Sequence, residues 1–190
     1  MRTPLLLSLL LLTAACSKLT TDSVEADAEA AKQSLYALES KSLDGELVPL
    51  ERFDGKVALV VNTASKCGFT GQYEGLEQLQ QEYGPRGFTV LGFPSGDFMG
   101  QEFATPGEIR AFCDAEFGVT FPMFEKSVVK DGDDQSPIYA FLGAATGSLP
   151  GWNFGKYLVA RDGRVLEFFA SPVDPTGDEI RQAIEAALAD

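Results

Sequence analysis

The stretch Asn62-Thr63-Ala64-Ser65-Lys66-Cys67-Gly68-Phe69-Thr70 decides how the fold of this sequence is interpreted. The apolar run before it, residues 57–61, has the composition of a buried strand, and residues 73–83 after it predict a helix. Cys67 therefore lies where a strand leads into the start of a helix. Peptide N–H groups and the helix dipole stabilise a thiolate there, and the thiolate is the reactive form of cysteine. A small buried residue is the alternative interpretation of a lone cysteine.

The N-terminus has the pattern of a bacterial export signal. Met1-Arg2 is positively charged, and the apolar run from Leu5 to Leu12 is too short to span a bilayer as a helix. Small residues then precede Cys16, as in a lipoprotein signal. We expect residues 1–15 to be removed and Cys16 to carry a lipid. Signal cleavage nearby without lipidation is the alternative.

The mature chain is predicted to hold one domain. Residues 16–33 are rich in Ala, Asp, Glu and Ser and predict a solvated tether. Residues 34–190 have the length of one domain with a full core. The net charge of −13 disfavours nucleic acid and anionic membrane surfaces as partners, so the lipid would be the only membrane contact.

Histidine is absent from the whole sequence. Its absence excludes Ser-His and Cys-His catalysis and most transition-metal sites, and no Asp/Glu spacing suggests a carboxylate metal site. We therefore predict neither a metal nor a cofactor. If Cys16 carries lipid, the remaining thiols are Cys67 and Cys113, which form either a structural disulfide or a redox couple.

The first half of the domain alternates strands and helices. Residues 47–50 suggest a hairpin or short strand, and residues 57–62 and 88–93 predict buried strands around the 73–83 helix. A capping box at Thr105 opens a helix expected to run to about residue 117 and to stop at Gly118. The inner face of that helix is predicted to carry Ile109, Phe112 and Cys113.

The second half predicts a short helix, a hairpin and a final helix. The short helix spans residues 136–142, and segments 157–161 and 164–169 flank Asp162-Gly163, a strong hairpin signal. Thr176 opens a second capping box. One face of the final helix carries Ile180, Ile184, Ala187 and Leu188. This order predicts a thioredoxin-like α/β fold, with a parallel and an antiparallel strand pair in one mixed sheet flanked by helices.

The sequence around Cys67 differs from that of a dithiol exchanger. A thioredoxin-type exchanger needs Cys-x-x-Cys, and Thr70 occupies the second position here. An oxidant converts a single thiolate to a sulfenic acid, which a second thiol can condense into a disulfide. Cys113 is the remaining candidate for that second thiol.

The sequence resembles the glutathione peroxidase family from about residue 35 to residue 188, and five segments carry the resemblance. They are Val61–Gly68, Leu91-Gly92-Phe93-Pro94, Gly100-Gln101-Glu102, Val119–Phe124 and Trp152-Asn153-Phe154. The resemblance implies that Cys67 is the peroxidatic residue and that Gln101, Trp152 and Asn153 complete the site. Their N–H groups are neutral donors that can stabilise a thiolate and orient a peroxide without histidine. Taken singly, these three residues also suit a core aromatic and two turn positions.

The resemblance also implies a role for Cys113, which matches the resolving cysteine of thioredoxin-dependent members. A disulfide needs Cα atoms within about 7 Å. We expect a longer resting distance and therefore local unfolding before the two sulfurs meet.

Three departures from the family pattern refine this prediction. Ser95 stands where members commonly have a cysteine, which strengthens the case for Cys113 as the only partner of Cys67. Nine residues separate Leu142 from Trp152, whereas tetrameric members have a longer insertion, so we expect a monomer. Cysteine rather than selenocysteine at position 67 makes glutathione doubtful as the main reductant.

The sequence thus predicts a thiol peroxidase for hydrogen peroxide and organic or lipid hydroperoxides, recycled by a thioredoxin-like protein or glutathione. We expect it in the bacterial cell envelope as a periplasm-facing lipoprotein, at the outer rather than the inner membrane, because Ser17 follows Cys16. The alternative is a non-catalytic redox-sensing or binding protein of the envelope on the same fold. A copper-chaperone role is disfavoured because it needs a second nearby cysteine and a histidine.

Overall fold

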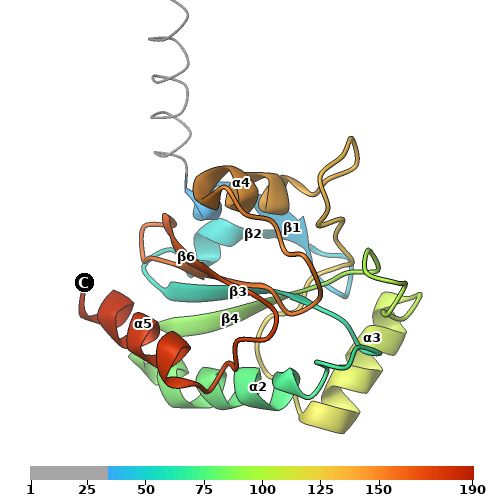
Figure 1. Ribbon diagram of the computed structural model, residues 1–190, viewed down its shortest axis with the longest axis horizontal. Coiled ribbons are helices and arrows are strands. Elements are labelled where there is room, and N and C mark those ends of the chain that lie inside the picture. Colours follow the sequence, from blue (N-terminus) through green and yellow to red (C-terminus); the bar gives the residue numbers. More distant parts are fainter. Residues whose placement is uncertain (1–33) are drawn as a thin grey trace, which may run out of the picture. The chain divides into compact units, whose positions relative to one another are not determined.

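The structure, a computed structural model, describes residues 34–190 (Figure 1). The signal at 1–15, the tether at 16–33 and the lipidation site Cys16 lie outside the described residues. Within residues 34–190, the helices are too short or too polar to cross a membrane.

A four-stranded mixed sheet forms the centre of the domain, in the order β4-β3-β5-β6. The parallel pair consists of β3, Val57–Thr63, and β4, Phe88–Pro94. On its other edge β3 pairs antiparallel with β5, Lys156–Val159, which pairs antiparallel with β6, Val165–Phe169. Every residue of β3 is buried, because β3 is a central strand covered on both faces. The predicted mixed sheet is confirmed.

Helices cover both faces of this sheet (Figure 1). Helices α2, Gln72–Tyr83, and α5, Asp178–Ala189, lie on one face, where the apolar cluster includes Leu59 and Val61 of β3. Helix α4, Pro137–Thr146, lies on the other face, over a cluster that includes Ala58 and Val60. Successive β3 side chains thus enter opposite cores, as the strand period of two requires.

Short elements complete the domain. A two-stranded sheet of β1, Glu39–Lys41, and β2, Leu47–Pro49, confirms the predicted hairpin. The 3-10 turns are η1, Leu35–Ala37, η2, Leu50–Phe53, and η3, Gly84–Arg86.

The predicted helix from Thr105 to residue 117 has two parts. Helix α3, Pro106–Phe112, begins with the expected capping box, in which Thr105 Oγ1 accepts the N–H of Glu108 at 3.3 Å and Glu108 Oε2 accepts that of Thr105 at 3.0 Å. The next turn, Cys113–Phe117, is π-helical and ends at Gly118, whose φ is +59°. The predicted extent of the helix and its stop at Gly118 are therefore confirmed, with a last turn that is π-helical.

The second predicted capping box, at Thr176, is not formed. Helix α5 begins after Gly177, which provides no side-chain cap. The Thr176 hydroxyl instead donates to Asp174 Oδ1 at 2.9 Å, and the Thr176 N–H donates to the same oxygen at 2.8 Å. Asp174 thus folds the loop back on itself and withdraws the threonine from the helix end.

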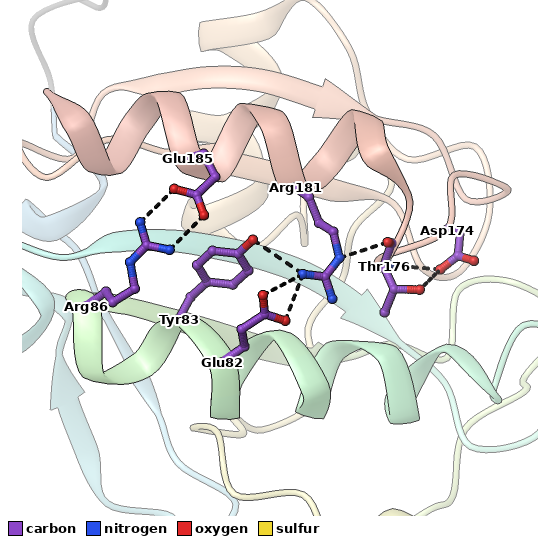
Figure 2. A network of polar contacts seen from close by, with 7 residues as sticks. All are labelled: Glu82, Tyr83, Arg86, Asp174, Thr176, Arg181 and Glu185. Carbon is purple, nitrogen blue, oxygen red and sulfur yellow. Dashed lines mark hydrogen bonds and ion pairs between the residues drawn. The ribbon is translucent and has the colours of Figure 1, made fainter.

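Ion pairs join α5 to α2 and to η3 at the surface (Figure 2). Arg181 donates to Glu82 at 2.7 Å, and Arg86 donates to both carboxylate oxygens of Glu185 at 2.7 and 2.6 Å. Water screens such exposed pairs, so the apolar face of α5 contributes most of its docking energy. Ile180, Ile184 and Ala187 are buried there, as the sequence predicts.

Candidate active site

Cys67 lies in a turn between β3 and α2. Helix α2 begins only at Gln72, so Cys67 precedes the helix by a full turn. Its Sγ accepts one peptide N–H, from Phe69, at 3.4 Å. The strand-to-helix placement is confirmed, and the local turn provides the N–H that faces the sulfur.

Thr70 fixes the turn that carries Cys67. Its Oγ1 accepts the N–H of Cys67 at 2.9 Å and donates to the carbonyl of Ala64 at 2.9 Å. The backbone closes in the other direction, because the N–H of Thr70 donates to the carbonyl of Cys67 at 3.0 Å. The residue that stands where an exchanger has its second cysteine is therefore the residue that shapes the Cys67 turn.

Gln101 and Asn153 meet beside this turn. Asn153 Nδ2 donates to Gln101 Oε1 at 3.1 Å. The carbonyl of Gln101 accepts the N–H of Lys66 at 2.9 Å, which ties Gln101 to the residue next to Cys67. Asn153 is fully buried, and its Oδ1 has no partner in the described structure. The structure thus brings together three of the predicted site positions.

Trp152, the only tryptophan of the chain, completes the group. It packs against the apolar cluster that contains Cys67, and its ring lies 5.6 Å from that of Phe98. Among residues 34–190, no hydrogen bond links Cys67 Sγ to the side chains of Gln101, Trp152 or Asn153. The Asn153 amide is instead engaged with Gln101. Lys66 places its ammonium 3.9 Å from the ring centroid of Phe103.

Asn62, at the end of β3, was missed as a site residue in the sequence. Its Nδ2 donates to the carbonyl of Trp152 at 3.1 Å, and its Oδ1 accepts the N–H of Gly155 at 2.9 Å. Its own carbonyl accepts the N–H of Phe154 at 2.6 Å. Phe154 has a φ of +67°, an unfavourable conformation for a bulky residue. The signal available in the sequence was the amide side chain of Asn62 directly after an apolar run. The structure shows that this side chain is fully buried.

Glu102 is a second residue that the sequence analysis did not single out. Its Oε1 accepts the N–H groups of Ser65 at 3.3 Å and Phe103 at 2.7 Å, which joins the Cys67 turn to the segment after Gln101. Glu102 Oε2 is buried without a partner in the described region. Burial raises the pKa of the Glu102 carboxyl, because the charged form loses its water.

Cys113 lies at the junction between α3 and the π-helical turn, 1% exposed against 9% for Cys67. Both cysteines are free thiols, so the alternative of a structural disulfide is not what the structure contains. Burial raises the pKa of the Cys113 thiol to about 11. Cys113 is therefore a neutral, covered thiol in this state. Phe112 and Phe117 flank it, with ring centroids 5.8 Å apart.

Ser95, at the position where the resembled family commonly has cysteine, is fully buried. Its Oγ accepts the N–H of Asp97 at 3.3 Å, and Asp97 in turn accepts the N–H of Val129 at 2.6 Å. Ser95 thus organises the loop that leads to Gln101.

Known proteins resemble this chain over most of its length. A family profile described as glutathione peroxidase matches residues 35–143. A hydroperoxy fatty acid reductase, gpx1 of Synechocystis, is 46% identical over 171 residues, which cover 83% of this chain and 98% of that protein. The thioredoxin/glutathione peroxidase BtuE of Escherichia coli is 40% identical over 182 residues, covering 83% and 99%.

Solved structures agree as well. The apo crystal structure of Trgpx has a TM-score of 0.66 at 37% identity, with 83% of this chain and 97% of that chain covered. A secreted disulfide oxidoreductase of Mycobacterium tuberculosis has a TM-score of 0.57 at 18% identity, covering 80% and 97%, which shows the thioredoxin-like fold alone. By its profile match and its relatives at 40% identity and above, the chain belongs to the glutathione peroxidase family.

Proposed function

We propose that this protein is a thiol peroxidase in which Cys67 is the nucleophile and Gln101, Trp152 and Asn153 supply hydrogen bonds. The observation that carries the proposal is the hydrogen-bonded pair of Gln101 and Asn153, which is tied to the Cys67 turn through the N–H of Lys66. Family membership and the names of the relatives support the reaction class.

The first step oxidises Cys67. The thiolate sulfur attacks one oxygen of the hydroperoxide, an S–O bond forms and the O–O bond breaks. The sulfur becomes a sulfenic acid, and the leaving oxygen takes a proton to give water or an alcohol. The Phe69 N–H at 3.4 Å stabilises the thiolate, and the amide and indole donors are suited to the charge that develops on the leaving oxygen.

The second step joins Cys67 to Cys113. The Cys113 sulfur attacks the sulfenic sulfur, an S–S bond forms, and the sulfenic oxygen leaves as water after taking up protons. A buried thiol with a pKa near 11 is a poor nucleophile, so this step requires the segment around Cys113 to open. The π-helical turn supports such opening, because π-helices are rare and occur often at functional sites. That the resting Cα distance exceeds the disulfide range stays a prediction.

The third step restores both thiols. A dithiol reductant, or two molecules of a monothiol such as glutathione, gives up two electrons and two protons and becomes a disulfide. We propose a thioredoxin-like protein as this reductant, with glutathione as the second possibility, since BtuE carries both in its name. A monomer leaves the Cys67 surface open to a protein partner, and the short 143–151 connection supports that state.

We further propose that Cys16 anchors the protein to a bacterial membrane, facing the periplasm, where lipid hydroperoxides are accessible. The lipoprotein-type signal supports the anchor, and the name of the Synechocystis relative supports lipid-derived substrates. Expression of the full chain and of Cys16→Ser tests the anchor. The wild type should fractionate with outer membranes, and Cys16→Ser should be released. Equal release of both proteins would contradict anchoring.

The enzymatic proposal is tested by steady-state consumption of hydrogen peroxide and of a fatty acid hydroperoxide with thioredoxin, thioredoxin reductase and NADPH. Wild type should consume both, and Cys67→Ser should lose activity to the uncatalysed level. Equal rates for the two proteins would contradict the proposal and favour the non-catalytic alternative.

A further inference from the structure

Lys156 is a buried cation that the peroxidase steps above do not use. It is the first residue of β5 and is fully buried. Its ammonium donates to three main-chain carbonyls, of Phe154 at 2.7 Å, Val173 at 2.8 Å and Ser171 at 3.3 Å. An ammonium has three protons, so these contacts use its full donor capacity.

This arrangement is poorly suited to stabilising the fold. No carboxylate lies within ion-pair distance of Lys156 among the described residues. Loss of hydration lowers the pKa of Lys156 to about 8, and the negative charge of Asp174 opposes that change only in part. A buried charge of this kind is often replaceable by an apolar side chain of similar size without loss of stability.

The carbonyls held by Lys156 belong to two segments that border the site. Phe154 follows Asn153 directly and has the left-handed φ of +67°. The carbonyl of Asn62 accepts the N–H of Phe154, and the ammonium of Lys156 donates to the carbonyl of Phe154. The strained residue is therefore hydrogen-bonded on both sides. Backbone strain persists at functional sites where surrounding contacts over-determine it.

The second segment connects to the Cys67 side of the site. The carbonyl of Ser171 accepts both Lys156 Nζ and, at 2.8 Å, Gln72 Nε2. Gln72 is the first residue of α2, the helix that follows the Cys67 turn. One carbonyl therefore links the Trp152–Phe154 turn to the start of α2.

We propose that Lys156 is a positioning residue, whose ammonium holds the Trp152–Phe154 turn in register with the Cys67 turn so that the Trp152 and Asn153 donors reach the peroxide. Lys156 acts through the main chain and touches none of the reacting atoms. The inference rests on the proposed role of Trp152 and Asn153, because a misplaced turn slows the reaction only if its donors take part in it.

The kinetic test compares Lys156→Met with wild type in the rate of Cys67 oxidation, followed in single turnover with hydrogen peroxide. Met keeps the length of the side chain and removes the charge. A displacement of about 1 Å in a reacting group can cost 10²-fold, so we expect a rate about ten- to hundredfold lower. Lys41→Met, the same change at an exposed position on β1, is the matched control and should keep the wild-type rate. A Lys156→Met rate within about twofold of wild type would overturn the proposal.

A spectroscopic test does not depend on activity, because Trp152 is the only tryptophan. The Cys67→Ser protein is used, so that no Cys67 thiolate titrates beside the indole. The groups around Lys156 are Val61 and Phe169 on the paired strands, Gln72 from α2 through the shared Ser171 carbonyl, and Asp174 from the loop before α5. Tyr73 of α2 lies one residue further away, with its ring centroid 5.5 Å from that of Phe154. Burial holds the pKa of Tyr73 well above its usual value, and the hydrogen bond from the Thr176 N–H lowers the pKa of Asp174. Neither group therefore titrates near pH 8.

Deprotonation of Lys156 should therefore change the Trp152 emission with a midpoint near pH 8, and Cys67→Ser/Lys156→Met should lack this transition. An emission independent of pH in the Cys67→Ser protein, or a transition that survives the Lys156→Met change, would overturn the proposal. If Lys156→Met fails to fold, the Cys67→Ser protein, which retains Lys156, can still be titrated. A pH-independent emission in that protein would still overturn the proposal. If wild type shows no Cys67-dependent peroxidase activity, the proposed function fails, whereas the emission test still decides whether Lys156 holds the turn.

Discussion

Asn153 donates a 3.1 Å hydrogen bond to Gln101 Oε1 across fifty-two positions of sequence. The bond occupies the carbonyl oxygen of Gln101, so its NH₂ group is the end of the side chain that remains to meet a ligand. Asn153 therefore orients the Gln101 amide, in addition to the donor role proposed for it. Hydrogen-bonded side chains of this kind act as a unit.

This pairing predicts how the two amides act together. Gln101→Ala and Asn153→Ala should each slow Cys67 oxidation, by an amount that approaches the 10²-fold typical of losing one transition-state donor. The double variant should be slower than wild type by much less than the product of the two single effects. Stopped-flow rates of Cys67 oxidation measure all three, with Gln135→Ala as a control for truncating a distant glutamine. Multiplicative effects would show that the two amides act independently.

Cys113 is predicted to act after the peroxide has reacted. Cys113→Ser should keep the single-turnover rate of Cys67 oxidation and lose thioredoxin-dependent turnover, because Cys113 is the only described thiol that can condense with the sulfenic acid. Mass spectrometry after peroxide and a sulfenic-acid trap should find the adduct on Cys67 in the variant and a Cys67–Cys113 disulfide in wild type. Undiminished thioredoxin-dependent turnover in Cys113→Ser would show that another thiol resolves the sulfenic acid.

The capping box of α3 should limit how readily Cys113 becomes exposed. Thr105→Ala removes the cap on Glu108 N–H and should lower stability by about 1 kcal/mol, which shifts Tm by about 2–4 °C in a domain of this size. Loosening this helix should speed formation of the Cys67–Cys113 disulfide after a peroxide pulse.

Ser34→Ala is the matched control for the cap. Ser34 Oγ accepts the N–H of Tyr36 at 3.1 Å and caps η1, a segment far along the chain from α3. This change should alter stability without altering the rate of disulfide formation. Equal disulfide rates in Thr105→Ala and wild type would argue that opening of α3 is not needed for resolution.

The raised pKa of Cys113 predicts a dependence of stability on pH. Its value of about 11 lies above the ordinary 9.0, so the folded protein binds the thiol proton more tightly than the unfolded chain does. The resulting stabilisation is present in full below pH 9 and is lost as pH rises through about 11.

Denaturant unfolding at about pH 8 and about pH 11 measures this contribution, which should be on the order of 2 kcal/mol. Cys67→Ser and Cys67→Ser/Cys113→Ser are compared, which prevents disulfide formation and cancels other titrating groups. The protein that retains Cys113 should lose more stability between the two pH values. Parallel losses would show that Cys113 is not buried as a neutral thiol in solution.

The sequence by itself determined the order of strands and helices along the chain and the position of Cys67 between a strand and a helix, because those depend on local patterns. That order then implied a mixed sheet through the rules for crossovers and hairpins. The apolar run at 57–61 and the Asp162-Gly163 turn each act within a few residues, and the structure confirms both the β3 strand and the β5–β6 hairpin. The absence of histidine and the threonine at position 70 likewise limit the possible catalytic chemistry from the sequence alone.

Only the tertiary structure decided the parts that depend on distant segments. The second capping box is a local exception, because Asp174 engages Thr176 from only two residues away. The turn that follows α3 is π-helical, and the ring centroid of its Phe117 lies 5.3 Å from that of Tyr73 in α2. In the sequence, Asn62 and Lys156 look like ordinary strand residues. In the fold, their polar atoms bind main-chain groups of the 152–155 turn. A buried polar atom must find a partner, and in these cases the fold, rather than the neighbouring sequence, determines which partner lies within reach.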